Sequence, residues 1–290
     1  MATSLSELRS GLPSQNKNVS NILLPLDGSE MSRTAIPVAR HLAELYKATA
    51  HLIYAGEEAI EPGRRMERLG VDWEELPGAV VDQSAGPAPE IILGLTRRLG
   101  KPLIVMCTRT GRESDPDAFG SVTEAVLAGN PERIVLVAPD TYRAPFCIRT
   151  LVLCQDGTPS ATVATAPALE LAQLSGADVI AALVATPCTE CPDEIGSLPA
   201  PQYIDQPQHE WPTWAQEFSM RMLMSGSTAG SLKFELVVSA GQPGTELTQV
   251  ARTRKADLVI MAVPGDWKRS KHKVARVLAE NSGCPVFLVR

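Results

Sequence analysis

The sequence contains one long internal repeat. An apolar run at Ile22–Leu26 leads into Asp27-Gly28-Ser29, and an apolar run at Ile148–Cys154 leads into Asp156-Gly157-Thr158. Each Asp-Gly turn is followed by a helical pattern and then by a second strand-like run. The offset of 129 residues between the turns is far longer than the roughly 20–50 residues of a solenoid repeat. The pattern therefore indicates two copies of one supersecondary plan.

The ends of the two copies match as well. Leu103–Met106 parallels Leu258–Met261, and Ile134–Ala138 parallels Pro285–Val289, and a helical stretch precedes each of the last two runs. Short, uninterrupted strands rich in Val, Ile and Leu that alternate with amphipathic helices are typical of a parallel sheet covered on both faces. The sequence therefore predicts an α/β fold of two tandem, doubly wound, Rossmann-like domains, each with a five-stranded parallel sheet.

The two copies set the expected domain boundaries. We expect a flexible N-terminal arm over residues 1–20, which are polar and lack periodicity, a first domain over 21–140 and a second over 146–290. The second domain is longer between its second and third strands. There we expect an insertion at about 186–232, with a helix that begins near Trp211.

The composition of the chain excludes some classes of function. The formal net charge is −6 and aromatic residues make up 4% of the chain, so neither general nucleic-acid binding nor base stacking is expected. No apolar stretch approaches the roughly 18 residues of a membrane span, and the N-terminal segment lacks the apolar core of a secretory signal. We therefore expect a cytoplasmic protein with reduced thiols. The six cysteines are too few and scattered for a disulfide framework.

The expected fold indicates where a ligand would bind. In open parallel sheets, ligands lie beyond the carboxyl ends of the strands, near the switch in strand order. In the first half this edge holds Asp27-Gly28-Ser29 and the segment after Met106. In the second half it holds Asp156-Gly157-Thr158 and the segment after Met261.

Over most of residues 20–290, outside the insertion, the chain resembles the universal stress protein family in its tandem form. In the first half the resemblance rests on two segments, NILLPLDGSEMSRTAIPVARHLAELYKATAHLIYA and PLIVMCTRTGRESDPDAFGSVTEAVLAGNPERIVLVAP. In the second half it rests on LVLCQDGTPSATVATAPALELAQLSGADVIAALVA and on the last 50 residues, which begin GQPGTELTQVARTRKADLVIMAVPG.

The resemblance implies a fold of the adenine-nucleotide alpha hydrolase type. It also implies that the last strands of the two domains pair back to back, as an intramolecular copy of the family's usual dimer. Nucleotide-binding members carry Gly-x2-Gly-x9-Gly-Ser/Thr after the fourth strand and an Asp beside the adenine and ribose. The positions that the resemblance assigns to nucleotide binding are Pro25, Asp27, Gly28, Thr110, Gly111, Gly120, Ser121, Asp156, Gly157 and Gly265.

The first half departs from that glycine pattern. Its four spaced positions are Cys107, Thr110, Gly120 and Ser121, so only the final Gly-Ser is kept, and Gly111 lies one place late. Side chains at the first two positions keep the backbone away from a phosphate. The same loop holds three acidic residues against two arginines, a balance that disfavours a triphosphate. We expect the first half to bind ATP weakly or not at all.

The second half departs differently. Its positions are Ala262, Gly265, Ala275 and Arg276, which keeps the second glycine and loses the terminal Gly-Ser. Five basic residues oppose one acid in this loop and the start of the last helix. These candidates for anion binding are Lys268, Arg269, Lys271, Lys273 and Arg276. We expect loose, salt-sensitive anion binding, and a solvated basic loop is the alternative.

Structural explanations stay open for several of these motifs. An Asp-Gly-Ser turn suits the start of a helix with or without a nucleotide, and Ser121-x-x-Glu124 fits a capping box. Cys188 and Cys191 form a motif-like pair, but the chain has no second such pair to complete a structural zinc site. We therefore expect no metal there, and a redox pair remains the alternative. No catalytic Ser-His-Asp or Cys-His arrangement is readable.

Together these observations predict a non-catalytic regulatory or protective stress-response protein with degenerate nucleotide sites, which acts by binding a small ligand or a protein partner. No cofactor is certain, and weak ATP hydrolysis stays open. The first alternative is an adenine-nucleotide sensor that binds ATP. The second is a metal or redox sensor that uses Cys188 and Cys191. The partners are expected to exclude nucleic acid and membranes, and a homodimer of the whole chain remains open.

Overall fold

The structure is a computed structural model of the chain. It describes a discontinuous set of segments, namely residues 19–56, 60–61, 64–108, 119–139, 145–185, 195–198, 211–224, 232–263 and 271–290.

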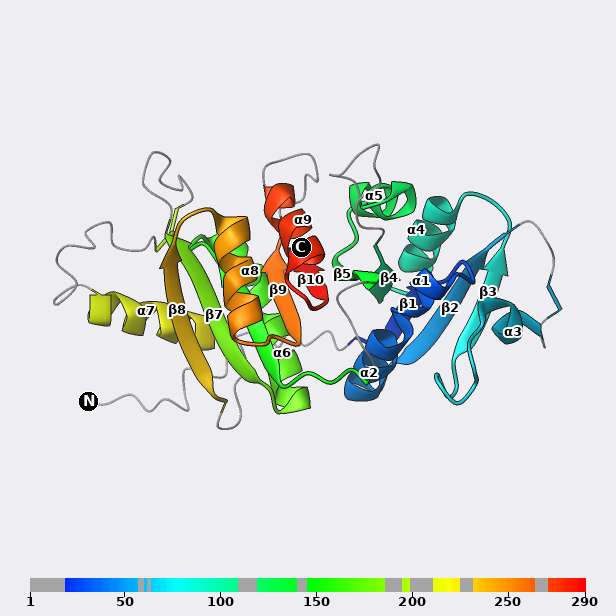
Figure 1. The fold of residues 1–290 in the computed structure, drawn as a ribbon, viewed down its shortest axis with the longest axis horizontal. Helices are drawn as coiled ribbons and strands as arrows, with labels where there is room; N and C mark the ends of the chain where they lie inside the picture. The colour runs from blue at the N-terminus through cyan, green and yellow to red at the C-terminus, as the bar shows by residue number, and fades with distance from the viewer. Residues whose placement is uncertain are drawn as a thin grey trace.

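The strands form one sheet of ten, in the order β3-β2-β1-β4-β5-β10-β9-β6-β7-β8 (Figure 1). Their bounds are β1 (Asn21–Pro25), β2 (Thr49–Ala55), β3 (Val80–Ser84), β4 (Leu103–Cys107), β5 (Arg133–Val137), β6 (Thr150–Gln155), β7 (Asp178–Ala185), β8 (Phe234–Ala240), β9 (Leu258–Ala262) and β10 (Val286–Val289). Each half has five parallel strands, and the first strand of the half lies third in its order. The predicted doubly wound topology is therefore confirmed.

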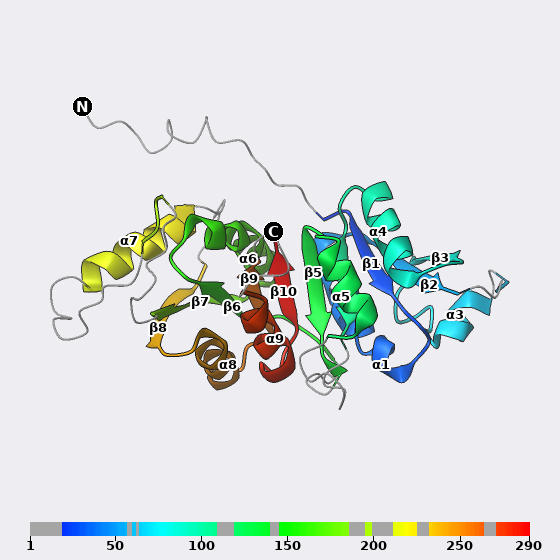
Figure 2. The same ribbon diagram turned by 90° about the horizontal axis from the view of Figure 1, so that it is seen from above.

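The two halves join through their last strands. β5 and β10 pair antiparallel, with Val135 opposite Phe287, and they lie side by side at the centre of the molecule (Figure 2). The back-to-back pairing that the resemblance implied is thus present. Instead of two separate sheets, the halves share one continuous sheet.

The helices cover both faces of this sheet. Their bounds are α1 (Glu30–Arg33), α2 (Ile36–Tyr46), α3 (Arg65–Leu69), α4 (Ala88–Arg98), α5 (Ser121–Ala128), the 3-10 helix η4 (Pro159–Ala164), α6 (Thr165–Ser175), α7 (Trp211–Met224), α8 (Pro243–Thr253) and α9 (Lys271–Asn281). In Figure 1, α4, α5 and α9 lie on the upper side of the sheet, whereas α2 and α6 lie on the lower side.

The core has two apolar layers, because successive strand side chains point to opposite faces. One layer contains Val135 and Phe287 on the side of α2 and α6, and the other contains Leu136 and Leu288 on the side of α5 and α9. All four side chains are at most 1% exposed. Each layer draws residues from both halves, so the junction is part of the core.

The insertion expected at 186–232 includes α7, which begins at Trp211 as the sequence predicted. Trp214, Phe218 and Met222 are buried and pack with Leu183 of β7. α7 lies between the second and third strands of its half, as α3 does in the first half. In the described residues, the crossover between the second and third strands of each half therefore contains one helix.

Candidate functional site

The candidate site of the first half begins with the turn after β1. One carboxylate oxygen of Asp27 accepts hydrogen bonds from the Ser29 backbone N–H at 2.9 Å and from the Ser29 hydroxyl at 2.6 Å. The Ser29 hydroxyl oxygen in turn accepts from the Ser32 N–H at 3.1 Å, which caps α1. This arrangement satisfies backbone donors at the helix start. The structural explanation of the Asp-Gly-Ser motif is therefore confirmed.

The second half repeats this geometry. Asp156 accepts from the Thr158 N–H at 3.0 Å and from its hydroxyl at 2.5 Å, and the Thr158 oxygen accepts from the Ala161 N–H at 3.2 Å. Gly28 and Gly157 have φ of 79° and 78°, the left-handed conformation that favours glycine. Two sequences that share only Asp-Gly and a hydroxyl residue thus form the same turn.

In each half, the crossover from the second to the third strand lies against this turn. A Cβ atom on Gly28 would lie 2.9 Å from the carbonyl oxygen of Arg68. In the second half, the Leu198 N–H donates to the Gly157 carbonyl at 2.7 Å. Pro25 is the half-buried last residue of β1. In each half, the turn after the first strand is therefore contacted by backbone atoms of the crossover between the second and third strands.

The end of β4 carries a side chain where the family pattern has a glycine. The Cys107 sulfur lies 3.5 Å from the Thr34 hydroxyl oxygen, whose proton is donated to the Met31 carbonyl at 2.7 Å, and α1 contacts β4. In the second half η4 contacts β9, whose last residue is the smaller Ala262. In the first half a thiol and a hydroxyl thus occupy space between the first turn and the end of β4.

The start of α5 differs from the expected capping box, and that interpretation is wrong. Gly120, with φ of 96°, is the N-cap, so Ser121 is already the first helical residue. Glu124 instead accepts from the Phe119 N–H at 3.3 Å. The helix begins one residue earlier than the box requires, because glycine adopts a positive φ that serine disfavours.

Arg276 pairs with Glu124 across the junction of the two halves. Its guanidinium Nη2 lies 2.6 Å from a carboxylate oxygen of Glu124, and both side chains are less than a third exposed. The guanidinium carbon also lies 5.6 Å from the centre of the Phe119 ring, within reach of a cation–π contact. The charge of this anion-binding candidate is thus largely matched by a carboxylate of the other half.

The remaining candidates divide by location. Lys271 and Lys273 lie in the first turn of α9. The other candidates lie outside the described residues, and these are Thr110, Gly111, Gly265, Lys268, Arg269, Cys188 and Cys191. The anion-binding hypothesis for the basic loop and the expectation of no zinc at the cysteine pair both remain predictions.

Among the described cysteines, two are buried in the second half. Burial raises the pKa of the Cys284 thiol to about 12 and raises the pKa of the Cys154 thiol even further above its ordinary value, so neither supplies a thiolate near neutral pH. The described part of the chain holds no cluster of three or more His, Cys, Asp or Glu side chains suited to a metal ion. It also holds no helix with the length and apolarity to span a bilayer.

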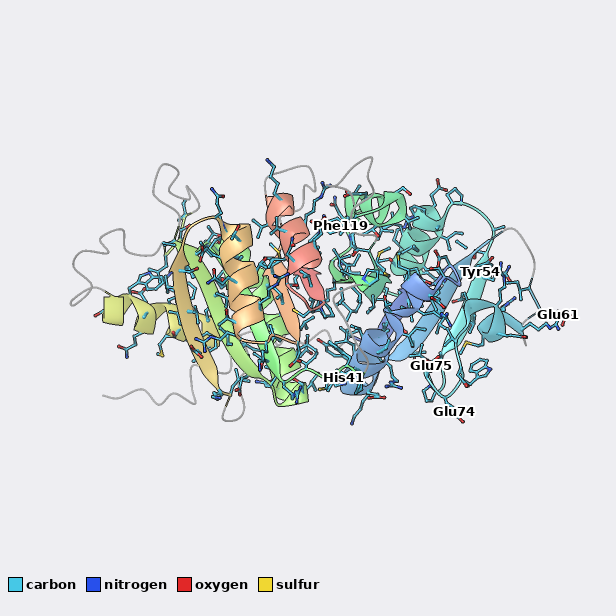
Figure 3. The ribbon with its side chains drawn as sticks, in the orientation of Figure 1. His41, Tyr54, Glu61, Glu74, Glu75 and Phe119 are labelled. Atoms are coloured by element: carbon cyan, nitrogen blue, oxygen red, sulfur yellow. The ribbon has the colours of Figure 1, made fainter. Side chains whose placement is uncertain are left out.

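The contacts between the halves include residues that sequence reasoning did not single out. Phe119 follows a candidate loop, and His41 contacts the start of the second half. Figure 3 labels both, Phe119 on the upper side of the junction and His41 on the lower side. Neither contact has a local sequence signal, because the partner across the junction, Arg276 for Phe119 and Ile148 for His41, lies more than 100 residues away. The proximity of α5 and α9 could have been predicted only from the back-to-back pairing that the resemblance implied.

Comparisons with known proteins agree with this geometry. The sequence model described as the universal stress protein family matches residues 148–290. A universal stress protein from Archaeoglobus fulgidus DSM 4304 superposes with a TM-score of 0.63 at 13% identity, over 94% of this chain and 98% of the other. A functionally unknown protein from Pseudomonas aeruginosa PAO1 superposes with a TM-score of 0.66 at 12% identity, over 93% and 92%. At these identities the superpositions show the fold alone. A comparison with functionally curated proteins gives no match.

Proposed function

Through its C-terminal half, residues 148–290, the chain belongs to the universal stress protein family, and from that premise we propose that it is a non-catalytic stress-response regulator. It acts by binding a small ligand or a protein partner, and its N-terminal half does not use ATP. The observation that carries the proposal is the contact of Cys107 with Thr34 at the end of β4.

This contact bears on ATP because of where it lies. A triphosphate needs backbone N–H groups that approach it closely, which small residues allow. In the first half, Cys107 fills part of that region, and its sulfur lies 3.5 Å from the Thr34 hydroxyl oxygen. Asp27 is meanwhile engaged by both polar groups of Ser29. The Asp-Gly-Ser residues of this turn are therefore explained by their role in capping α1, without a nucleotide.

A nucleotide sensor that uses only the C-terminal half is the second candidate function. The observation that favours it is Ala262, which places a methyl group at the end of β9 where β4 ends in a thiol. The Gly157 turn is otherwise a close copy of the Gly28 turn. A sensor of metal or redox state through Cys188 and Cys191 remains a third hypothesis.

Titration calorimetry of the full chain with Mg-ATP tests the proposal, with Asp27→Ala and Asp156→Ala as matched variants. We expect no micromolar binding by the first half, where micromolar affinity means about −8 kcal/mol. A micromolar constant lost only in Asp27→Ala would refute the proposal. A constant lost only in Asp156→Ala would replace it with the second candidate. Mass spectrometry of ligands released from undialysed protein gives an independent check.

A further inference from the structure

A histidine fastens the N-terminal half to the first strand of the C-terminal half. His41 lies on α2, and its Nε2 accepts a hydrogen bond from the backbone N–H of Ile148 at 3.3 Å. Its ring meets the buried ring of Phe146 edge to face, with centroids 5.5 Å apart and planes at 84°. Both partners belong to the segment that leads into β6. A single imidazole thus bonds to this segment and packs against it.

The same segment is held on its other side by a carboxylate. Asp257 accepts from the N–H groups of Arg149 and Thr150 at 2.9 and 3.0 Å. Three consecutive backbone donors, Ile148 to Thr150, therefore bond to side chains, and only the first bonds to a group of the other half. The contact of His41 is the one among these three that joins the halves.

The hydrogen bond requires a neutral imidazole at Nε2. A ring nitrogen that accepts must carry a lone pair, and protonation turns both ring nitrogens into donors. The imidazolium would then face the Ile148 N–H with a second donor, which removes the bond. Histidine is the side chain whose charge ordinarily changes between pH 5 and 8.

The surroundings of His41 favour the neutral ring. Burial lowers the pKa of His41 below its ordinary value of 6.5, Glu44 and Asp257 oppose this shift, and Arg40 adds to it. Glu44 and Arg40 lie on the same helix as His41, and Asp257 acts on the ring electrostatically from the other half. Because the unfolded chain takes up this proton more readily than the folded one, the stabilisation is present above about pH 6.5 and is lost as the pH falls.

We propose that His41 is an acid-sensitive contact between the two halves, whose protonation releases the Ile148 N–H and loosens α2 from the start of β6. This inference goes beyond the proposed function, because it assigns to the junction a response to proton concentration. It does not depend on whether either half binds a nucleotide.

Amide hydrogen exchange of the full-length protein, followed by NMR in steps from about pH 7.5 down to about pH 5, tests the proposal, because burial places the pKa of His41 below 6.5. On acidification, the protection factor of the Ile148 amide should fall about fivefold, as expected from the loss of one hydrogen bond of typical strength. That of Thr150, which Asp257 holds, should stay nearly constant. Unchanged protection of Ile148, or an equal loss at both amides, would overturn the proposal.

Two substitutions separate titration from packing. His41→Gln keeps an acceptor without a titratable ring, so the protection of Ile148 should become independent of pH. His41→Leu removes the acceptor, so Ile148 should be poorly protected across this pH range. His51→Gln is the matched control, because His51 bonds to Asn21 at 3.0 Å, within the first half. A pH-dependent loss that persists in His41→Gln contradicts the proposal even if His41→Leu does not fold.

Discussion

At the residue scale, a comparison of Gly28 with Gly78 separates two costs of adding a side chain in a left-handed turn, namely backbone strain and steric overlap. Its φ is 79°, and an added Cβ would lie 2.9 Å from the Arg68 carbonyl oxygen. Gly78 has a similar φ of 72° with nothing within 4 Å of the added Cβ. Gly78→Ala should therefore cost about 1–2 kcal/mol for conformation alone. Gly28→Ala should cost roughly 1–3 kcal/mol more, because the crossover must shift.

The measurement is the free energy of unfolding of both variants in urea. Equal losses would show that the crossover moves away from the turn at little cost. A larger loss in Gly28→Ala would show that the first turn and the crossover after β2 are rigidly packed, as the short contact indicates.

At the scale of elements, the ion pair between α5 and α9 should stabilise the junction. Arg276 and Glu124 are less than a third exposed, and Phe119 covers one side of the guanidinium. A double-mutant cycle with Arg276→Gln and Glu124→Gln should give a coupling of about 1 kcal/mol in the free energy of unfolding. The matched control is the pair of Arg221 with Glu217 within α7.

The control pair has a similar separation, 2.7 Å, but each side chain is about half exposed. Its coupling should stay near 0.3–0.5 kcal/mol, because solvent screens exposed pairs on one helix. Equal couplings in both cycles would argue that the Arg276 contact is incidental and would restore that residue as a free anion-binding candidate.

At the scale of the whole molecule, the two halves should unfold together. Both apolar layers cross the junction of β5 and β10, where Val135 and Phe287 are fully buried. We expect variants that retain only Trp73, in the first half, or only Trp214, in the second, to report the same midpoint of thermal unfolding by fluorescence. Clearly separate midpoints would show two units that merely touch.

The sequence alone determined the layout of each half. Apolar runs that alternate with amphipathic patterns predicted the strands and helices, and the repeat predicted the duplication. The Asp-Gly turns were readable too, because Asp27 and Asp156 act on residues only two positions away. Such turns can be predicted from the sequence because the hydrogen bonds that form them join residues only a few positions apart.

The tertiary structure alone decided which side chains meet across these parts. Glu124 reads as a capping residue for Ser121, yet it bonds to Arg276, 152 positions away, and His41 bonds to Ile148, 107 positions away. Cys107 could be recognised as a departure from a glycine pattern, but its contact with Thr34 depends on how α1 lies against β4. Such contacts arise from packing across the sheet and the junction, and no spacing along the chain encodes them.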